Sequence, residues 1–139
     1  MTVKLEQFEK LLRSNGLFCT KPRLHLFMSL QKYNEVTISE LINLLNVHDQ
    51  ATVYRNIKLF EKLGIINRLR LGWHSKLELS DIFHHHHHHF TCLKCGEIII
   101  LKENQALEQE ITRISNQLDF QASDHQIEIR GYCKKCIVS

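Results

Sequence analysis

Four of the five cysteines in the sequence form two closely spaced pairs. Two residues separate Cys92 from Cys95, two separate Cys133 from Cys136, and 37 residues lie between the pairs. This spacing lets both sulfurs of a pair bind one ion from a tight turn, and two such pairs complete the tetrahedral four-sulfur shell that suits Zn²⁺. A redox-active dithiol is the alternative. We favour a structural zinc ion, which would contribute on the order of 10 kcal/mol to folding.

Six consecutive histidines, His84–His89, precede the first cysteine pair. A purification tag and a solvated metal-trapping tract are the alternatives, but the run lies in the middle of the chain. In an extended segment alternate side chains face opposite ways, so His87 and His89 can share one metal ion while His86 and His88 share another. Further oxygen and nitrogen donors elsewhere in the sequence are Glu78, Glu108 and His125. Such mixed ligands suit Fe²⁺, Mn²⁺, Zn²⁺, Co²⁺ or Ni²⁺.

Charge is distributed unevenly between the two halves of this 139-residue chain. Residues 1–82 hold 12 lysines and arginines against 8 acidic residues, whereas residues 83–139 hold 6 against 7. A basic first half fits a nucleic-acid surface, although ordinary scatter of surface charge explains it as well. No apolar stretch approaches the ~20 residues of a membrane-spanning helix, and the N-terminus lacks the apolar segment of a signal peptide. We therefore expect a cytoplasmic protein without a membrane partner.

The first half must position these groups through helices and a hairpin. Apolar periodicity predicts helices at residues 3–15, from residue 20, at 37–46 and at 50–63, then strands at 65–71 and 76–79 joined by a turn from Gly72 to Ser75. Thr37 and Glu40 have the spacing of a capping box, and Asp49 can cap the helix that follows. This order is that of a winged helix-turn-helix, whose last helix lies in the major groove of DNA.

The second half predicts a smaller α/β unit. We expect a buried strand at residues 97–101, an amphipathic helix at 106–118 and a half-buried strand at 126–132. About 50 residues of this kind make a thin core that needs a metal ion or a partner subunit. The predicted fold class is therefore α+β, with a winged-helix domain at residues 1–81 and a metal-binding dimerisation domain at residues 82–139.

Several motifs in order resemble those of the ferric uptake regulator family. They are Thr20-Lys21-Pro22-Arg23, Ala51-Thr52-Val53-Tyr54-Arg55, Gly64-Ile65-Ile66, Leu77-Glu78-Leu79 and the histidine run that leads into Cys92-x-x-Cys95-Gly96 and closes at Cys133. The resemblance covers roughly residues 5–136. It implies a dimeric winged-helix repressor that binds palindromic operator DNA when loaded with a divalent metal.

The resemblance also assigns roles by position. Cys92, Cys95, Cys133 and Cys136 match structural zinc ligands. Glu78, His87 and His89 match a regulatory metal site, and His86, Glu108 and His125 match a further site in which His88 stands in place of the usual aspartate. Tyr54 and Arg55 match DNA contacts on the recognition helix. Thr52 of the same motif and the nearby cation Lys21 complete the predicted DNA-binding set.

One departure concerns the fourth regulatory ligand. The family often has a histidine before its third helix, where this sequence has Glu35. Glu35 can ligate, which would favour Fe²⁺ or Mn²⁺ over Zn²⁺, or it is a solvated surface charge and His74 or a water molecule completes the shell. Iron is the favoured signal, with manganese or zinc as alternatives. Peroxide sensing, metal buffering and a metalloenzyme are the rival functions, and tetramers are an alternative to the dimer.

Overall fold

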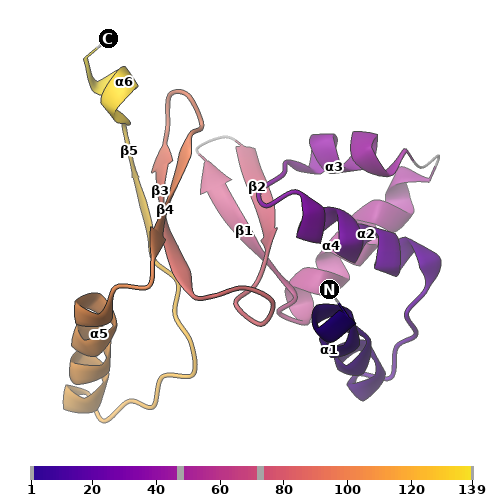
Figure 1. The fold of residues 1–139 in the computed structure, drawn as a ribbon, viewed down its shortest axis with the longest axis horizontal. Coiled ribbons are helices and arrows are strands. Elements are labelled where there is room, and N and C mark those ends of the chain that lie inside the picture. Colours follow the sequence, from indigo (N-terminus) through magenta and orange to yellow (C-terminus); the bar gives the residue numbers. More distant parts are fainter. Residues whose placement is uncertain (1, 47–48, 72–73, 139) are drawn as a thin grey trace. The chain divides into compact units, whose positions relative to one another are not determined.

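A computed structural model describes residues 2–46, 49–71 and 74–138 of the chain (Figure 1). The chain divides into two compact units, Met1–His84 and His85–Ser139. Each unit is described by itself below. The sequence-based boundary, between residues 81 and 82, remains a prediction of where two independently folding domains meet.

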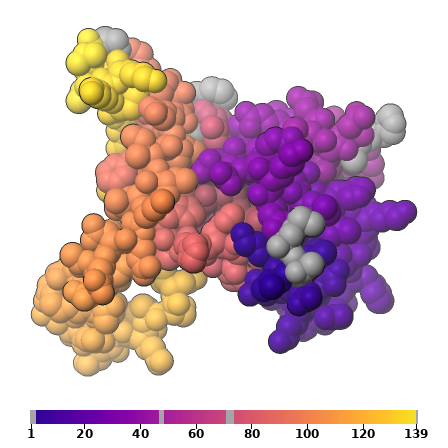
Figure 2. Space-filling view, viewed as in Figure 1, coloured from indigo at the N-terminus to yellow at the C-terminus, as the bar shows by residue number. Residues whose placement is uncertain are grey.

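The first unit consists of four helices followed by a two-stranded hairpin. Its elements are α1 (Thr2–Ser14), α2 (Lys21–Lys32), α3 (Ile38–Leu45), α4 (Gln50–Lys62), β1 (Ile66–Leu71) and β2 (His74–Leu79). The two strands pair antiparallel, with Ile66 opposite Leu79. This is the predicted winged helix-turn-helix order, and the predicted Gly72–Trp73 part of the turn lies outside the described residues. Figure 2 shows the helices of this unit, indigo to magenta, as one packed body.

The predicted helix-start signals are confirmed in the first unit. At α3 the Thr37 hydroxyl accepts a hydrogen bond from the Glu40 backbone N–H, and the Glu40 carboxylate accepts one from the Thr37 N–H, both at 3.1 Å. At α4 the Asp49 carboxylate accepts a hydrogen bond from the Thr52 N–H at 3.4 Å. These contacts satisfy N–H groups that a helix leaves without an internal partner, so they fix where α3 and α4 begin.

Aromatic packing holds α4 against the other helices of this unit. The rings of Phe8 and Phe27 stack with centroids 4.2 Å apart, and Phe60 of α4 meets Phe8 edge-on at 5.5 Å. Phe83, which follows the hairpin, packs edge-on against Phe27 at 5.0 Å. Because α4 is anchored through its buried face, its other face is left for binding.

The second unit is a three-stranded sheet with two helices. Its elements are β3 (His87–Cys92), β4 (Ile98–Lys102), α5 (Gln105–Gln117), β5 (Glu128–Gly131) and the short α6 (Lys134–Ile137). β3 is central, antiparallel to β4 and parallel to β5. The extended histidine segment is thus the middle strand of the sheet, a position that its composition did not indicate.

The interior of the second unit is unusually polar. In the described part of this unit, the buried residues are His88, His89, Thr91, Cys92 and Cys133. The expectation of a buried strand at residues 97–101 is wrong, because Ile99 and Ile100 of β4 are about half exposed, and no residue of α5 is buried. The apolar side chains of these elements find no second layer within the described chain, so ligand-type residues occupy the interior instead.

A search of the described helices finds none that is both long enough and apolar enough to cross a membrane.

Candidate metal centres and nucleic-acid interface

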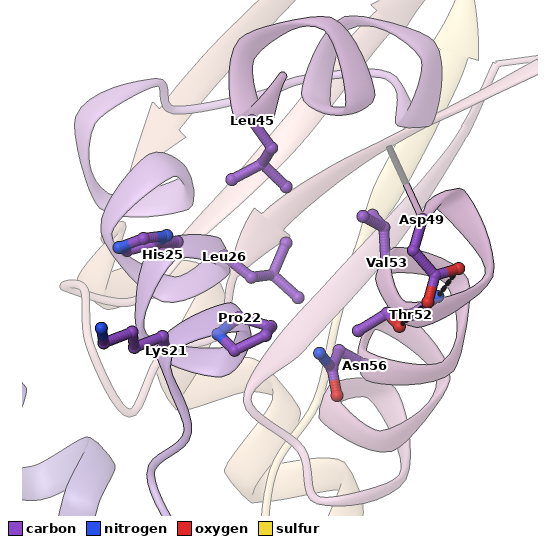
Figure 3. Close-up of a pocket in the computed structure, with 9 residues that line it drawn as sticks. All are labelled: Lys21, Pro22, His25, Leu26, Leu45, Asp49, Thr52, Val53 and Asn56. Carbon is purple, nitrogen blue, oxygen red and sulfur yellow. Dashed lines mark hydrogen bonds between the residues drawn. The ribbon is translucent and has the colours of Figure 1, made fainter. Parts of the chain in front are cut away.

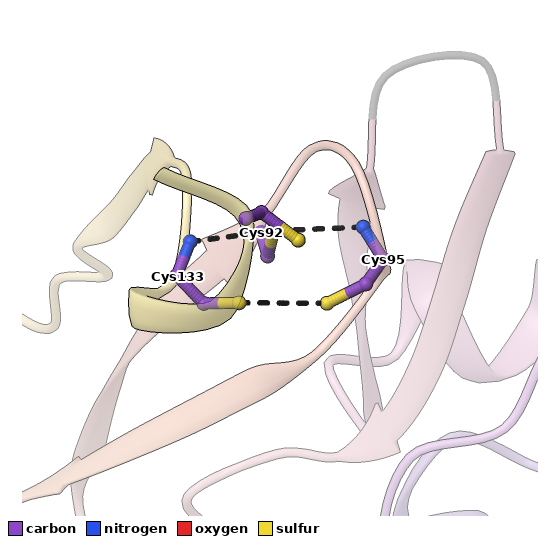
Figure 4. Close-up of side chains that lie close together, drawn as sticks. Cys92, Cys95 and Cys133 are labelled. Atoms are coloured by element: carbon purple, nitrogen blue, oxygen red, sulfur yellow. Dashed lines mark hydrogen bonds between the residues drawn. The ribbon is translucent and has the colours of Figure 1, made fainter. Parts of the chain in front are cut away.

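The four paired cysteines come together at one end of the second sheet. Cys92 ends β3 opposite Gly131 of β5, and Cys133 follows two residues after Gly131, so the parallel pairing of β3 and β5 brings the two cysteine pairs side by side (Figure 4). The sulfurs of all four cysteines lie within 4.8 Å of one another, and those of Cys95 and Cys133 are 3.7 Å apart. Sulfurs around a tetrahedral zinc ion at about 2.3 Å are separated by about 3.8 Å, so the spacing fits.

The surroundings of the sulfurs favour a bound cation. The backbone N–H groups of Cys95 and Cys133 donate to the Cys92 sulfur at 3.5 and 3.4 Å, and they lower the pKa of Cys92 to about 6. Burial, together with the neighbouring sulfurs, raises the pKa of Cys136 to about 12. Four crowded thiols cannot all ionise without a cation among them, and a zinc ion removes that obstacle. The donor set therefore fits structural zinc.

A second cluster in the same unit joins three histidines to one carboxylate. It consists of His86, His88, Glu108 and His125. His86 directly precedes β3 and His88 lies in it, and the Nε2 atoms of both point to the Oε1 atom of Glu108 on α5, at 3.1 and 2.8 Å. The Nε2 atom of His125 lies 2.8 Å from the other carboxylate oxygen and 3.0 Å from Nε2 of His86. Ligand atoms around a tetrahedral ion at about 2.0–2.1 Å are about 3.3 Å apart, close to these separations.

Electrostatics in this second cluster also favour a cation. Burial penalises the ionised form of Glu108, but the hydrogen bond with His88 and the three nearby imidazoles outweigh that penalty and lower its pKa. His88 is only 1% exposed, which is rare for an imidazole outside a metal or hydrogen-bonded site. The cluster therefore offers three imidazole nitrogens and an ionised carboxylate, which suit Fe²⁺, Zn²⁺, Co²⁺ or Ni²⁺.

His87 and His89 occupy the other face of β3. Their ring centroids are 4.7 Å apart. The Nδ1 atom of His87 lies 2.9 Å from the backbone oxygen of His85, which can only accept, so Nδ1 carries the proton and the imidazole lone pair is on Nε2. A carbonyl that orients a histidine in this way is typical of metal-binding histidines.

The remaining predicted regulatory ligands lie in the first unit. Glu78 of β2 is only 3% exposed, so its carboxylate is held away from water. Glu35 is half buried, one residue before Val36, which forms an isolated bridge with Leu77 of β2. Among the described residues, neither Glu35 nor His74 belongs to a group of three or more ligand atoms within 4.8 Å. The completion of the regulatory shell by either residue stays a prediction.

The predicted DNA-contacting residues lie at the start of α4 and of α2. Tyr54 is 50% exposed and Arg55 is exposed, so both side chains are accessible on α4. The Thr52 hydroxyl donates to the Asp49 carboxylate at 2.6 Å and accepts a hydrogen bond from the Arg55 guanidinium at 3.0 Å. This chain of contacts orients Arg55 along the helix surface. Lys21, the first residue of α2, is exposed.

Two features of this unit escaped the sequence interpretation. A cysteine outside the two metal-binding pairs is expected to be a buried, inert core thiol; that expectation is wrong for Cys19, which is exposed. Asn56 was not singled out, although it lies among Val53, Ile57 and Phe60 on the buried face of α4. The sequence could have revealed Asn56, because it is a polar residue at a position where the helical periodicity of α4 predicts an apolar one.

Comparison with known sequences gives a match to one family. The chain matches the sequence model described as the ferric uptake regulator family over residues 14–130. The ferric uptake regulation protein of Campylobacter upsaliensis is 33% identical over 145 residues, covering 96% of this chain and 89% of that protein. The peroxide-responsive repressor PerR of Staphylococcus aureus strain Mu50 is 30% identical over 140 residues, covering 96% of this chain and 91% of that protein.

Comparison with solved structures agrees. The ferric uptake regulator of Vibrio cholerae superposes with a TM-score of 0.72 at 32% identity, covering 90% of this chain and 98% of that one. The ferric uptake regulator of Francisella tularensis, solved with iron, gives a TM-score of 0.69 at 28% identity, covering 85% of this chain and 92% of that one.

Proposed function

The chain belongs to the ferric uptake regulator family of metal-responsive DNA-binding regulators, and on that premise we propose that it represses transcription by binding operator DNA as a homodimer when Fe²⁺ fills its regulatory site. Mn²⁺ and Zn²⁺ are the alternative signals. The observation that carries the proposal is the alternation of histidines along β3, with His88 beside Glu108 on one face, His87 beside His89 on the other, and Cys92 of the cysteine cluster at the end of the strand. The protein would act in the cytoplasm, and its metals would serve structure and signalling rather than catalysis.

We assign the regulatory site to Glu78, His87 and His89, with Glu35 as a further ligand. His87 and His89 belong to the second unit and Glu78 and Glu35 to the first. A divalent cation held by all of them supplies a fixed link between the two units. Glu78 is suited to this role because a buried carboxylate is stabilised by pairing or by a cation. The carboxylate oxygens make the site harder than an all-imidazole site and favour Fe²⁺ or Mn²⁺ over Zn²⁺.

The other two centres would support the dimerisation domain. Cys92, Cys95, Cys133 and Cys136 would hold Zn²⁺ and tie the end of β3 to α6. His86, His88, Glu108 and His125 would bind a further divalent metal and fasten α5 to the sheet. Half-exposed apolar side chains on β4, β5 and α5 would be covered by a second copy of the chain, and a tetramer would be a further stage of association.

DNA binding would rest on α4 and the start of α2. Tyr54, Arg55 and Thr52 would reach the major groove, and Lys21 would contact a phosphate. In a dimer the two α4 helices must enter grooves one or more helical turns apart. Linking each DNA-binding unit to its dimerisation unit favours the arrangement that meets this spacing, and coupling of this kind is typically worth ~1–3 kcal/mol.

The test compares metal dependence in three histidine and cysteine variants. Protein that retains zinc but is stripped of other metals is titrated with each divalent metal under anaerobic, reducing conditions. The duplex is selected from a random-sequence pool by the Fe²⁺-loaded protein. We expect His87→Ala to keep its fold and lose the metal response, while Cys95→Ser unfolds or monomerises the protein. His85→Ala is the matched control, because His85 is exposed in the same run and belongs to no cluster. Tight operator binding by the stripped protein would overturn the proposal.

Peroxide sensing is the second candidate, favoured by the likeness to a peroxide-responsive repressor. In that case the iron-loaded protein would lose DNA binding on exposure to peroxide, with oxygen added to His87 or His89. Mass spectrometry of the peptide that contains the histidine run distinguishes peroxide sensing from iron sensing. We expect no oxidised histidine, in line with the proposed Fe²⁺-sensing role.

A further inference from the structure

A small cleft in the first unit lies between α2, α3 and α4 and is separate from all three metal-ligand clusters. Its volume is about 200 Å³. Leu26 and Val53 form its buried floor, while Pro22 and Leu45 line its sides (Figure 3). Binding sites for drug-sized ligands have volumes of about 300–1,000 Å³, so this cleft suits an occupant of about one ring. Its apolar lining favours a ligand with an apolar body.

One polar side chain in this cleft lacks a partner. Asn56 is only 7% exposed, and its amide makes no hydrogen bond within the part of the chain that the structure describes, although its polar atoms remain in contact with solvent. Figure 3 shows this amide pointing from α4 toward Pro22 across the cleft. The amide is therefore available to donate a hydrogen bond to a ligand in the cleft, in place of the water that reaches it there.

The charges around the cleft select the sign of the ligand. Lys21 and His25 line it from α2, and both are exposed at its rim. The opposing carboxylate, Asp49, is engaged by the N–H and hydroxyl of Thr52, and these hydrogen bonds lower its pKa. Asp49 stays ionised, but Arg55 lies 3.9 Å from it and offsets its charge, so an anionic group would be held on the α2 side of the cleft, by Lys21. A ligand with an apolar body and one carboxylate fits the cleft, because the body can pack on the apolar floor while the carboxylate accepts hydrogen bonds from the Asn56 amide and the Lys21 ammonium.

We propose that this cleft binds a small aromatic carboxylate, with its ring against Leu26 and Val53 and its carboxylate held by the Asn56 amide and Lys21. Lys21 and Thr52 line the same cleft and belong to the predicted DNA-binding set. An occupied cleft would engage Lys21 and stand between the starts of α2 and α4. The ligand would therefore weaken operator binding independently of the regulatory metal. This second effect rests on the proposed function, whereas ligand binding itself does not.

The binding test uses benzoate and the zinc-containing, ¹⁵N-labelled full chain without DNA. We expect the side-chain NH₂ signals of Asn56, assigned by their loss in Asn56→Leu, to shift and saturate with benzoate. Acetate supplies the charge without the ring, and inorganic phosphate tests whether the cleft is instead a seat for a DNA phosphate. Both should leave these signals unchanged at equal ionic strength. An equal shift with acetate or phosphate, or no saturable shift with benzoate, overturns the proposal.

Variants test the two polar contacts. Asn56→Leu keeps the approximate shape of the side chain without its donors and should weaken benzoate binding by about tenfold or more, as loss of a hydrogen bond to a charged group predicts. Asn56→Asp should abolish binding through repulsion, and Lys21→Ala should weaken it several-fold. Asn43→Leu, an exposed change on α3 outside the cleft, is the matched control. Unchanged affinity in both Asn56→Asp and Lys21→Ala overturns the proposal even if Asn56→Leu fails to fold.

The last arm measures operator affinity with benzoate present. We expect saturating benzoate to weaken binding by the metal-loaded wild type and to leave Asn56→Asp unaffected. If benzoate binds at Asn56 but the operator affinity of the wild type is unchanged, the coupling to DNA is overturned while the binding site stands. If the protein binds no DNA under any condition, the proposed function fails separately.

Discussion

At the scale of single residues, neighbouring histidines point to opposite sides of one extended segment. His86 and His88 meet Glu108 on one side, while the rings of His87 and His89 lie together on the other. Glu108 is the group on which the first of these centres depends, because both of its oxygens contact histidines. A carboxylate in this position supplies charge as well as geometry, and the two contributions can be separated by an isosteric change.

We predict that Glu108→Gln will lose the additional metal while keeping the cysteine-bound zinc. Glutamine preserves the shape but removes the negative charge, so affinity should fall by at least the 10–100-fold seen for outer-shell changes at metal sites. Titration with Co²⁺, followed by visible absorption and by metal analysis, measures the loss. Glu110→Gln on the same helix is the control, since Glu110 pairs with Arg113. A comparable loss in the control would mean that helix stability, and not ligation, is being measured.

The ligand types of these centres could be predicted from sequence, but their environment could not. Strand alternation was enough to predict that His86 and His88 would lie together, since the period of two is a property of the backbone. The burial of His88, and the lack of a hydrogen-bond partner for the Asn56 amide among the described residues, depend on packing between segments far apart in sequence. Local pattern carries no information on such contacts.

At the scale of elements, short-range signals predicted the helices well and the second unit less well. Thr37 and Asp49 act within three residues of their partners, so the starts of α3 and α4 could be derived from the sequence. The burial of β4 could not, because apolar side chains such as Ile99 indicate a surface to be covered without indicating what covers it. The short helix α6 was missed because its four residues are ordered around Cys133 and Cys136 rather than by helical propensity.

Helix α4 offers an unusual prediction about stability. Asn56→Leu should raise the free energy of unfolding by up to about 1 kcal/mol, since Asn56 is only 7% exposed and an apolar group of similar size costs less to bury than an amide that makes no hydrogen bond within the described chain. Leu26→Ala, in the same cleft, should lower it by about 2–5 kcal/mol as a normal core truncation does. Urea denaturation of both variants beside wild type makes the comparison. If Asn56→Leu is destabilised as strongly as Leu26→Ala, the amide has a partner that we have not identified.

At the scale of the whole molecule, the two units differ in what holds them together. The first has a continuous apolar core that includes stacked aromatic rings, whereas the buried side chains of the second are mostly ligand types. Folding of a unit with so little buried apolar surface is expected to depend on metal ions and a partner subunit. The two units should therefore respond differently to the same treatment.

Removal of zinc should unfold the second unit and spare the first. A strong chelator under reducing conditions is expected to make residues 85–139 sensitive to protease while a fragment that ends near residue 84 survives. Mass spectrometry identifies the surviving fragment. Cys19→Ser serves as the control, because Cys19 lies outside the cysteine cluster and its loss should not change zinc content. Simultaneous digestion of both units would contradict the assignment of separate cores.

The uncovered apolar face of the second unit predicts association. Leu118, which is 71% exposed at the end of α5, is a candidate for the subunit interface. We expect Leu118→Lys to weaken the dimer markedly, because a charge would be buried against apolar surface. Sedimentation velocity over a range of concentrations gives the dissociation constant. Leu44→Lys, at an exposed leucine of the first unit, should leave association unchanged, and equal dissociation in both variants would argue against this face.

The length of the histidine run has a consequence for how this protein can vary. Counted back from Cys92, the four histidines assigned to the two proposed centres are His86 to His89, and the run continues for two more residues toward the N-terminus. Deleting one or two histidines therefore leaves an imidazole at every one of those four positions. Only the tether that leads back to β2 becomes shorter. The repeat thus separates the length of the segment before His86 from the identity of the ligands. That length can change during evolution while the four ligand positions stay histidine.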